Sequence, residues 1–413
     1  MTGHQLTGNR ACKRIVACCL KKHKKSIACA VNANIIFFVI QYHLSNMKKT
    51  AEEDDPPGGN LSLKGLTIAF LYNVRHRYPN PDDPATYLET DFDDPPSIKA
   101  MIKNLKSCGR KVIPIEADEK AYLKLYKNRK KIDVVWNFSE GLHGRDRECQ
   151  LPAMMEMLGI PYTGSSPLTQ AIILNKIRTK EILSLYGVPV LPHQVFEGAE
   201  SAGGVGKKLR DEFKFPLIVK PVSQGSSAGI TNASVVKNEG AFRAQLKWVF
   251  DNIGGAAMVE PFLKGREFSC SMIGNPPVVL PIIESSHSML PKNLNPIDSL
   301  EVKWIIEEEI DIDKYLTCPA KIEGGFKRKL EDICRKTWDA LGVFDWCRVD
   351  IRCDEKGNPY VLEVNSPPGC QPPEISLSSY FPIAARATGL DYPSLLKKLI
   401  NITLKRYKNE NHN

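Results

Sequence analysis

The chain has 413 residues, enough for two or three domains of ordinary size, and its 42% apolar and 25% charged residues are typical of a soluble protein with a hydrophobic core. The formal net charge of +9 is concentrated at one end, because residues 1–50 contain nine Lys and Arg and no Asp or Glu, whereas residues 51–413 contain 47 residues of each sign. The body of the protein is therefore neutral, which argues against a nucleic-acid-binding enzyme.

Twelve cysteines are scattered along the chain without a C-x-x-C pair. This spacing argues against a zinc site and a redox-active dithiol, and a disulfide framework is unusual in a chain of this length. We therefore expect reduced thiols and a cytoplasmic location.

Residues 1–62 are expected to form a basic extension and a linker outside the folded body. The apolar run from Ile27 to Ile40 is shorter than the roughly 20 residues of a spanning helix and contains two asparagines. We expect translation to start at Met47, with a membrane anchor as the alternative, so membrane contact is expected only if the extension is real. The following AEEDDPPGGN is polar and rich in Pro and Gly, which predicts a linker.

Between residues 63 and 164, strand-like and helix-like segments alternate. Apolar runs at 66–72, 111–117 and 133–138 predict parallel strands that are buried on both faces. Apolar residues at helical spacing predict a helix at 97–109, and a second helix that runs into a turn within 151–164. This alternation predicts a small, open parallel-sheet domain.

A second unit is expected at 165–263, where one helix is predicted over 169–187 and a strand ends at Lys220. A loop of small residues, Gly225 to Gly229, follows that strand. The loop fits a plain turn, for which Gly and Ser are suited. It also fits a lid whose N–H groups and hydroxyls close over phosphate oxygens beside the Lys220 charge. The loop sequence alone leaves both interpretations open.

The third unit, 264–405, contains the segment WCRVDIRCDEKGNPYVLEVNSPPG at 346–369, which predicts a β-hairpin around the turn DEKGN. Residues two apart in a strand share a face, so Arg348 and Asp350 lie together on one strand, and Glu363 and Asn365 on the other. Three hard oxygen ligands without His or Cys suit Mg²⁺. The alternative is that they are outward polar positions of an antiparallel sheet. The opposite face is apolar and is expected in the core: Val349, Ile351, Leu362 and Val364.

A further cluster follows an apolar strand that reaches Glu260. A short linker separates it from Glu267, at the start of the next strand. A flat aromatic ring commonly binds at such a hinge between domains. Glu260 is a candidate acceptor from an adenine amino group, the Leu263 N–H a donor to a ring nitrogen, and Glu267 an acceptor from ribose hydroxyls. The alternative is that both glutamates are exposed strand residues.

Taken together, these segments resemble motifs of the ATP-grasp ligases, specifically the D-alanine–D-alanine ligase family. The motifs occur in order: LNK at 174–176, IVKP at 218–221, QGSSAG at 224–229, VEPFLKGREF at 259–268, CPA at 318–320, RVDI at 348–351 and LEVNSPPG at 362–369. GIPYTGSSPLTQAIILNKIRTK and PIAARATGLDYPSLLKKLI are similar to that family too. The match runs from about residue 135 to 405.

The resemblance implies an α/β (α+β) protein with the ATP-grasp fold, in which an open parallel-sheet N-terminal domain precedes two α+β subdomains that sandwich ATP. It implies an ADP-forming ligase that activates a carboxylate as an acyl phosphate and joins it to an amine. The implied cofactors are ATP and two Mg²⁺ ions, with Mn²⁺ as the alternative. The implied partners are small amino-acid or peptide substrates and no nucleic acid, and a homodimer is left open.

The resemblance also implies a role for each site residue. The implied ATP-binding residues are Lys176, Lys220, Gly225, Ser226, Ser227, Gly229, Glu260, Leu263 and Glu267. The implied metal ligands are Asp350, Glu363 and Asn365, and the implied catalytic residues are Arg348, Lys303 and Ser226. The implied substrate-binding residues are His143, Glu148, Gly369 and Ser379. Arg348 would face the oxygen on which negative charge develops, and Lys303 would lie on a mobile loop near the γ-phosphate.

Four departures from the family pattern all fall on substrate contacts. The N-terminal region offers only Glu89 or Asp91 in place of the family's amino-group-binding glutamate. The segment after His143 is shortened, Trp304 replaces a loop tyrosine, and the turn before Ser379 is longer. These changes spare the ATP and metal positions, so ATP-dependent ligase chemistry is expected while the amino-acid pair stays open.

Three alternatives remain beside a D-alanine–D-alanine ligase. The first is an ATP-grasp ligase that joins a different amino acid or peptide acid to an amine. The second is a nucleotide-binding regulatory protein without catalysis, against which Arg348, Asp350, Glu363 and Asn365 argue. The third is a kinase that transfers phosphate, which would not need an amine for ADP release.

Overall fold

The computed structural model describes residues 63–410, except Lys64, Pro81, Arg110, 199–212 and 305–310. The expected extension and linker at 1–62, with the apolar run and Met47, lie outside these residues. None of the helices in the described part combines the length and apolar character needed to cross a membrane. The eight cysteines that are described are all free thiols.

The N-terminal sheet is parallel, as predicted, with the strand order β2-β1-β3. Its strands are β1 (Thr67–Tyr72), β2 (Lys111–Glu116) and β3 (Val134–Phe138). Alternate residues of β1 pack into different cores: Phe70 packs in the core that includes α3, and Leu71 in the core that includes α4 and α5. Both faces are therefore covered, which explains why these strands read as continuous apolar runs.

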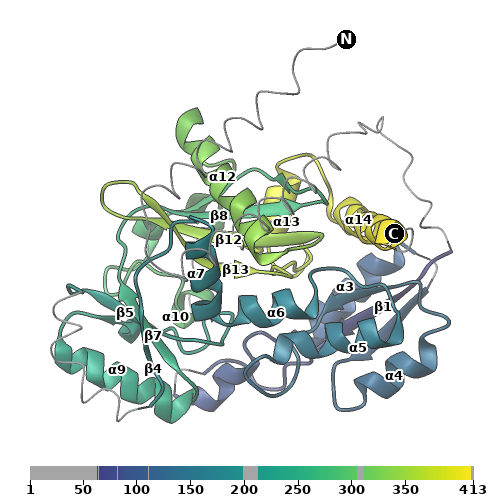
Figure 1. Ribbon diagram of the computed structural model, residues 1–413, viewed down its shortest axis with the longest axis horizontal. Coiled ribbons are helices and arrows are strands. Elements are labelled where there is room, and N and C mark those ends of the chain that lie inside the picture. Colours follow the sequence, from purple (N-terminus) through teal and green to yellow (C-terminus); the bar gives the residue numbers. More distant parts are fainter. Residues whose placement is uncertain are drawn as a thin grey trace, which may run out of the picture. The chain divides into compact units, whose positions relative to one another are not determined.

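A four-stranded antiparallel sheet follows, with the order β4-β7-β5-β6. Its strands are β4 (Gln194–Phe196), β5 (Leu217–Pro221), β6 (Val235–Val236) and β7 (Ala257–Pro261). Helix α9 packs against it through Phe242, Leu246 and Val249 (Figure 1). This sheet positions Lys220 at the end of β5 and Glu260 on β7.

The third sheet is antiparallel with the order β11-β10-β8-β12-β13, and β9 pairs with β8. Its strands are β8 (Glu267–Ile273), β9 (Val278–Val279), β10 (Ile283–Ser285), β11 (Leu316–Thr317), β12 (Trp346–Cys353) and β13 (Pro359–Asn365). Helix α12 covers one face through a separate core. Trp346 connects this sheet to the N-terminal sheet, because its ring lies 5.3 Å from that of Trp136.

The helices follow the predicted order. They are α3 (Pro95–Lys106), α4 (Ala121–Asn128), α5 (Gln150–Leu158), α6 (Pro167–Leu174), α7 (Lys176–Leu185), α9 (Glu239–Asn252), α10 (Leu300–Trp304), α11 (Ile312–Tyr315), α12 (Gly324–Leu341), α13 (Tyr380–Arg386) and α14 (Tyr392–Glu410). Four described 3₁₀ turns are η1 (Pro84–Glu89), η2 (Arg147–Cys149), η4 (Asn232–Ser234) and η5 (His287–Met289).

The single helix predicted over 169–187 is wrong. Asn175 has an extended backbone, with ψ 96°, and its side chain accepts hydrogen bonds from the backbone N–H groups of Ile177 and Arg178. Asn175 therefore ends α6 and caps α7, since an asparagine oxygen satisfies the free N–H groups of a helix start. The break places Lys176 at the first residue of α7, where its side chain reaches the site.

The predicted hairpin is confirmed by the pairing of β12 with β13. Asp350 lies opposite Glu363, and Arg348 opposite Asn365. The pairing then shifts by one residue, so that Ile351 pairs with Val361. Leu362 is the extra residue of this β-bulge and lines a cavity instead of the core. The expectation that Leu362 packs with Val349, Ile351 and Val364 is therefore wrong.

Candidate active site

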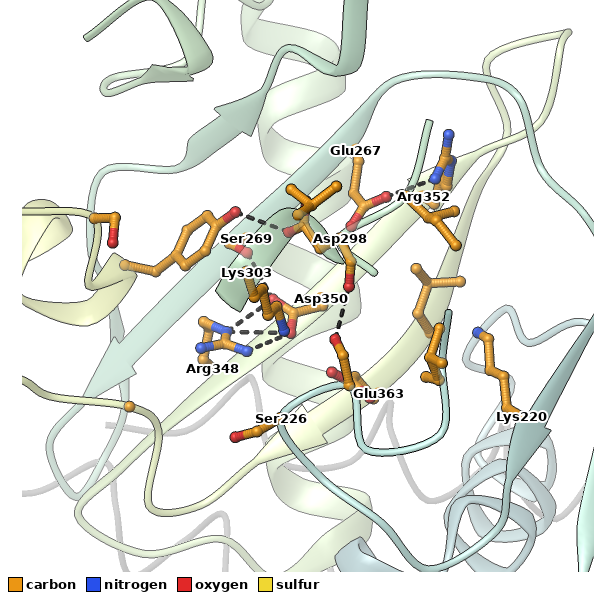
Figure 2. A pocket seen from close by; sticks show the side chains of 18 of the residues that line it. Lys220, Ser226, Glu267, Ser269, Asp298, Lys303, Arg348, Asp350, Arg352 and Glu363 are labelled. Carbon is orange, nitrogen blue, oxygen red and sulfur yellow. Dashed lines mark hydrogen bonds and ion pairs between the residues drawn. The ribbon is translucent and has the colours of Figure 1, made fainter. Parts of the chain in front are cut away.

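Two adjacent cavities contain most of the predicted site residues. The larger, about 310 Å³, is lined by residues of β5, β7, β8, β12, β13 and α10 (Figure 2). The smaller, about 110 Å³, lies beyond the end of β3 and beside the start of α7. Ser226, Glu363 and Gly369 line both cavities. The two cavities therefore meet where the hairpin and the small-residue loop face each other.

The predicted residues divide between these cavities. The larger cavity alone is lined by Lys220, Ser227, Glu260, Leu263, Glu267, Lys303, Arg348, Asp350 and Ser379. The smaller cavity alone is lined by Glu148, Lys176, Gly225 and Asn365. Gly229 and His143 line neither.

Arg348 and Asp350 form a closely bonded pair on β12. Arg348 donates through Nε and Nη2 to the Asp350 carboxylate, at 2.8–3.1 Å, and Ser269 donates to it at 2.6 Å. The Asn365 amide adds a hydrogen bond at 3.1 Å from β13. Within the described residues Arg348 Nη1 makes no hydrogen bond, and this leaves one donor of the guanidinium for a ligand.

Glu363 lies among positive charges. Its carboxylate is 3.7 Å from Lys176 Nζ. Burial acts to raise the pKa of Glu363, but the charges of Lys176, Lys303, Arg348 and Lys220 overcome this effect and lower the pKa to about 2. The hairpin therefore carries an ionised carboxylate at the junction of the cavities, surrounded by cations suited to a polyphosphate.

The carboxylate of Glu260 is not available to an adenine ring, so that the expectation for it is wrong. Glu260 is fully buried, with Lys220 Nζ 2.7 Å from one oxygen and Lys180 Nζ 2.9 Å from the other. Burial acts to raise the pKa of Glu260, but the two lysines lower it to about 2. Its side chain instead fixes the position of Lys220 at the cavity wall.

The small-residue loop needs its two glycines for different reasons. A Cβ atom at Gly225 would lie 2.6 Å from Asp91 Oδ1, so the absence of a side chain lets the loop backbone lie against the Asp91 carboxylate of the smaller cavity. Gly229 has φ +75°, and a Cβ there would meet Pro221 and Ile253 within 2.8 Å. Gly229 therefore serves backbone conformation and packing and lines neither cavity, and its expected place in the ATP site stays a prediction.

The loop is docked over the larger cavity by Ser227 and Trp304. Ser227 Oγ donates to the main-chain carbonyl of Asp298 at 2.6 Å, and Trp304 Nε1 donates to the Ser226 carbonyl at 3.5 Å. A small core of Tyr87, Ala228 and Leu300 lies behind the loop. These contacts join the loop to α10, which carries Lys303.

Glu267 lies at the far wall of the larger cavity, at the start of β8. Arg352 donates to its carboxylate at 2.9 Å, and His287 Nε2 is 3.9 Å away. Burial raises the pKa of Glu267, although His287 and Arg352 oppose the shift. Glu267 lines the larger cavity, and the predicted ribose contact stays a prediction.

Acidic residues line the smaller cavity. Asp91 is ion-paired with Arg147 at 3.0 Å, whereas the carboxylates of Glu140 and Glu148 make no hydrogen bond or ion pair within the described residues. Burial, with Glu148 and Asp91 nearby, raises the pKa of Glu140 well above its ordinary value. Burial raises the pKa of Glu148 to about 7, although Arg147 opposes the shift.

Some of the substrate candidates line the smaller cavity and others do not. Asp91 lines the smaller cavity, whereas the Glu89 carboxylate accepts from the backbone N–H groups of His76 and Arg77 and lines neither cavity. His143 is exposed, whereas Glu140, two residues after β3, lines the cavity together with Glu148. Glu140 is positioned by its N–H, which donates to Asn73 Oδ1 at 2.8 Å. His143 therefore lies outside both cavities, and its expected substrate-binding role stays a prediction.

A model of the D-alanine–D-alanine ligase C-terminus family matches residues 182–401, more than half of the chain. The chain belongs to the D-alanine–D-alanine ligase family. This membership confirms the recognition from the motifs, and with it an ATP-dependent ligase with the ATP-grasp fold.

Similar proteins match this family member over more than its C-terminal region. The chain is 31% identical over 316 residues to an uncharacterized protein, y4sG, of Sinorhizobium fredii, covering 75% of this chain and 87% of the relative. It is 31% identical over 280 residues to a D-alanine–D-alanine ligase of Pelotomaculum thermopropionicum, covering 67% and 81%. A Bacillus anthracis D-alanine–D-alanine ligase solved with ATP shares the fold, with a TM-score of 0.62, 23% identity, and coverage of 84% of this chain and 100% of that one.

The sequence of this ligase gave no direct signal for several residues around the cavities. Lys180 could have been noticed, because it lies one helical turn after Lys176 in an apolar context. Arg352 could also have been noticed, because it continues the Arg348, Asp350 face of its strand. His287, Asp298 and Arg75 follow no motif and are brought to the site by the fold alone.

Proposed function

We propose that this ligase joins two D-alanine molecules, with ATP in the larger cavity and the carboxylate-donating amino acid in the smaller one. The observation that carries this proposal is the meeting of both cavities at Glu363, Ser226 and Gly369. A carboxylate in the smaller cavity and a γ-phosphate from the larger one would face each other there, so that binding brings the two reacting groups together.

The proposed nucleotide contacts follow from the cavity wall. Lys176 and Lys220 would bind phosphate oxygens, the Leu263 backbone the base, and Glu267 the ribose hydroxyls. Ser226, at φ 41°, places its backbone where the cavities meet. Its position supports a role over the phosphates, close to the γ-phosphate.

The donor set of Asp350, Glu363 and Asn365 suits Mg²⁺ by its chemistry, because it offers hard oxygen atoms on one face of the hairpin and no nitrogen or sulfur ligand. Metal binding would require the Arg348, Ser269 and Asn365 groups that now donate to Asp350 to rearrange. We assign these residues as the ones that would hold it. When bound, the metal would neutralise phosphate charge and polarise the phosphorus.

The reaction has two steps. A carboxylate oxygen of the first amino acid forms a bond to the γ-phosphorus, and ADP leaves, which produces an acyl phosphate. The amine nitrogen of the second amino acid then bonds to the acyl carbon, loses a proton, and inorganic phosphate leaves with the former carboxylate oxygen. Arg348, with Nη1 directed to no partner among the described residues, would stabilise the oxyanion of this step. Lys303 would balance the charge at the transferred phosphate.

The free carboxylates of Glu140 and Glu148 support an ammonium site in the smaller cavity. A positive group there would favour the ionised carboxylates that burial disfavours. The amino group of the first D-alanine supplies such a charge. Gly369 and Ser379, on the larger cavity, would contact the second amino acid.

The test is ADP release with amino acids supplied singly and in pairs, with the product identified by its mass. We expect ADP release that depends on D-alanine and a dipeptide product of the mass of D-alanyl-D-alanine. Turnover with another amino acid or peptide acid, and none with D-alanine, would overturn the substrate assignment. ADP release that needs no amine and yields a stable phosphorylated product would overturn the ligase mechanism.

A further inference from the structure

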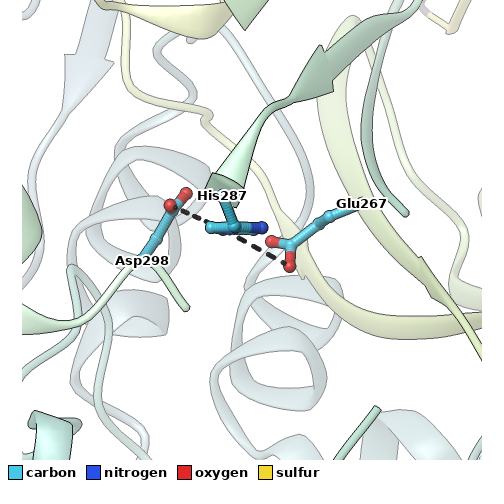
Figure 3. Close-up of side chains that lie close together, drawn as sticks. All are labelled: Glu267, His287 and Asp298. Carbon is cyan, nitrogen blue, oxygen red and sulfur yellow. Dashed lines mark hydrogen bonds and ion pairs between the residues drawn. The ribbon is translucent and has the colours of Figure 1, made fainter. Parts of the chain in front are cut away.

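A buried imidazole lies between two carboxylates at the wall of the larger cavity. His287 Nε2 is 3.2 Å from Asp298 Oδ1 and 3.9 Å from Glu267 Oε2, and Figure 3 shows the ring between the two acids. The His287 side chain is only 7% exposed. Glu267 and Asp298 line the cavity, whereas His287 does not and lies behind them.

These three residues have the composition of a metal site, and their ligand atoms lie within 4.8 Å of one another. Other donors already surround the two acids, however. Glu267 accepts from Arg352 at 2.9 Å, and Asp298 accepts from the hydroxyls of Tyr315 and of Tyr380, the latter at 3.0 Å. A metal would have to displace these donors, whereas a protonated imidazole fits the spacing as it stands.

The charges that face the imidazole are the carboxylates of Glu267 and Asp298 and the guanidinium of Arg352; the Tyr315 ring meets it edge-on, with centroids 5.9 Å apart. Among these groups the two carboxylates outnumber the guanidinium, and a protonated His287 offsets the excess negative charge; Lys303 adds a further positive charge that acts on Asp298. Burial acts to lower the pKa of His287, but Glu267 and Asp298 raise it above its ordinary value.

Both partners of His287 have a place in nucleotide binding. Glu267 is the proposed ribose acceptor, and the main-chain carbonyl of Asp298 accepts the hydrogen bond from Ser227 that docks the small-residue loop. A neutral imidazole would leave the carboxylates of Glu267 and Asp298 without the positive charge that lies between them, while the Arg352 guanidinium stays bonded to Glu267, and their repulsion would widen this wall of the cavity.

We propose that His287 is a positioning residue for ATP: as an imidazolium it holds Glu267 and Asp298 at the spacing that the nucleoside and the docked loop require. The inference rests on the proposed function in one respect, that ATP occupies the larger cavity. It is therefore tested by ATP binding, which needs no turnover. If the natural chain does not bind ATP, the proposed function is contradicted. If it binds ATP but without the pH dependence described below, only this inference is contradicted.

The experiment compares ATP dissociation constants from pH 6 to 9, at fixed Mg²⁺, for the natural chain, His287→Gln and His76→Gln. His76 is the control, because it lies 3.8 Å from a carboxylate but is 70% exposed and lines neither cavity. Titration of ATP itself affects all three proteins equally. We expect affinity in the natural chain and in His76→Gln to fall about tenfold as pH rises through the pKa of His287, the size expected for losing one charged hydrogen bond.

In His287→Gln, affinity is expected to be about tenfold weaker at pH 6 and to lose the part of the pH dependence that comes from the imidazole, since the amide carries no charge at any pH. The change that remains is due to ATP and to the other groups that titrate near the cavities, such as Glu148, whose pKa burial raises to about 7. A pH profile equal to that of the natural chain would overturn the proposal. If His287→Gln does not fold, the imidazole is titrated by NMR in the natural chain with and without ATP. Because linkage is reciprocal, ATP should raise the pKa of His287, and an unchanged pKa would overturn the proposal. Zinc retained after dialysis and absent from His287→Gln would also overturn it, in favour of a metal site.

Discussion

The guanidinium of Arg75 stacks over the indole of Trp304, with the guanidinium carbon 4.4 Å from the ring centroid. Arg75 is held in turn by the main-chain carbonyls of Glu89 and Thr90, at 3.2 Å each. Trp304 follows Lys303 directly and donates to the Ser226 carbonyl. One stacked pair thus joins the N-terminal region to the loop and the helix that close the larger cavity.

Arg75→Ala should raise the number of ADP molecules released per amide bond formed. Loss of about 1 kcal/mol from a cation–π pair corresponds to a roughly fivefold shift toward an open lid, and an open lid admits water to the acyl phosphate. The measurement compares ADP with dipeptide in the same reaction. Arg129→Ala is the control, because it removes a guanidinium 3.8 Å from the Tyr126 ring, on a helix that lines neither cavity. An unchanged ratio in Arg75→Ala would contradict the role of the stack.

Glu363→Gln should reduce amide formation roughly a hundredfold or more, which corresponds to a few kcal/mol of transition-state stabilisation. The neutral amide removes the carboxylate proposed to hold Mg²⁺ and leaves the surrounding cations without their partner. Asp354→Asn is the matched control in the same hairpin. The Asp354 carboxylate only organises the turn, by accepting from the N–H groups of Lys356 and Asn358.

Both hairpin variants would be assayed for activity and thermal stability across a Mg²⁺ titration. Asp354→Asn should be nearly silent in rate. Equal activities, or a loss in Glu363→Gln explained entirely by unfolding, would remove the metal-site assignment.

The hairpin was predictable in register because alternating residues and a short turn leave few ways to pair two strands. That is why Asp350 was correctly placed opposite Glu363. The same rule failed at Leu362, since alternation assumes that no residue is inserted. The break at Asn175 was missed for a related reason: apolar spacing continues through it, and only the backbone of one residue departs from the helix.

The roles of Glu260 and His143 could not be read from the sequence. A glutamate on a strand near a hinge has the same sequence pattern whether its side chain faces a ligand or, as in this fold, two lysines from α7 and β5. The family resemblance points to His143, but the length of the chain after β3 places Glu140 at the cavity. Motif position fixes a residue's neighbours in sequence, whereas loop length decides which of them reaches the site.

Lys180→Met should mainly reduce the stability of the fold, whereas Lys220→Met should mainly weaken ATP binding. Lys180 is 1% exposed, so its loss leaves Glu260 with one partner in the interior and should cost about 3–5 kcal/mol of unfolding free energy. Lys220 lies at the cavity wall, and its loss should weaken ATP binding more than Lys180→Met does in protein that remains folded. Denaturant unfolding and ATP binding of both variants provide the measurement. Equal effects on both quantities would contradict the division of roles.

The ion pairs of Glu260 with Lys180 and Lys220 also predict that the stability of the fold depends on pH. The pKa of Glu260 is lowered in the folded protein from its ordinary 4.5 to about 2. The stability due to this shift is therefore fully present above pH 4.5 and is lost as the pH falls toward 2. Lys180→Met should show a weaker loss over this range than the natural chain.

Glu140→Gln should raise the KM for D-alanine as the carboxylate donor about tenfold or more, while leaving the KM for ATP unchanged. A charged hydrogen bond to the substrate ammonium is worth roughly 1.5–3 kcal/mol. His143→Gln should change neither constant, because His143 is exposed and lines neither cavity. A larger effect of His143→Gln than of Glu140→Gln would restore the motif-based assignment.

The β-bulge gives this ligase a site of easy variation beside its most constrained residues. Leu362 takes no place in the one-to-one pairing of β12 with β13, yet its side chain lines the larger cavity. Its exchange for a smaller or larger residue, or even its deletion, would leave Asp350 opposite Glu363 and Ile351 opposite Val361. Evolution and engineering can therefore reshape the larger cavity, where ATP is proposed to bind, at this position without moving Asp350 and Glu363, the proposed metal ligands.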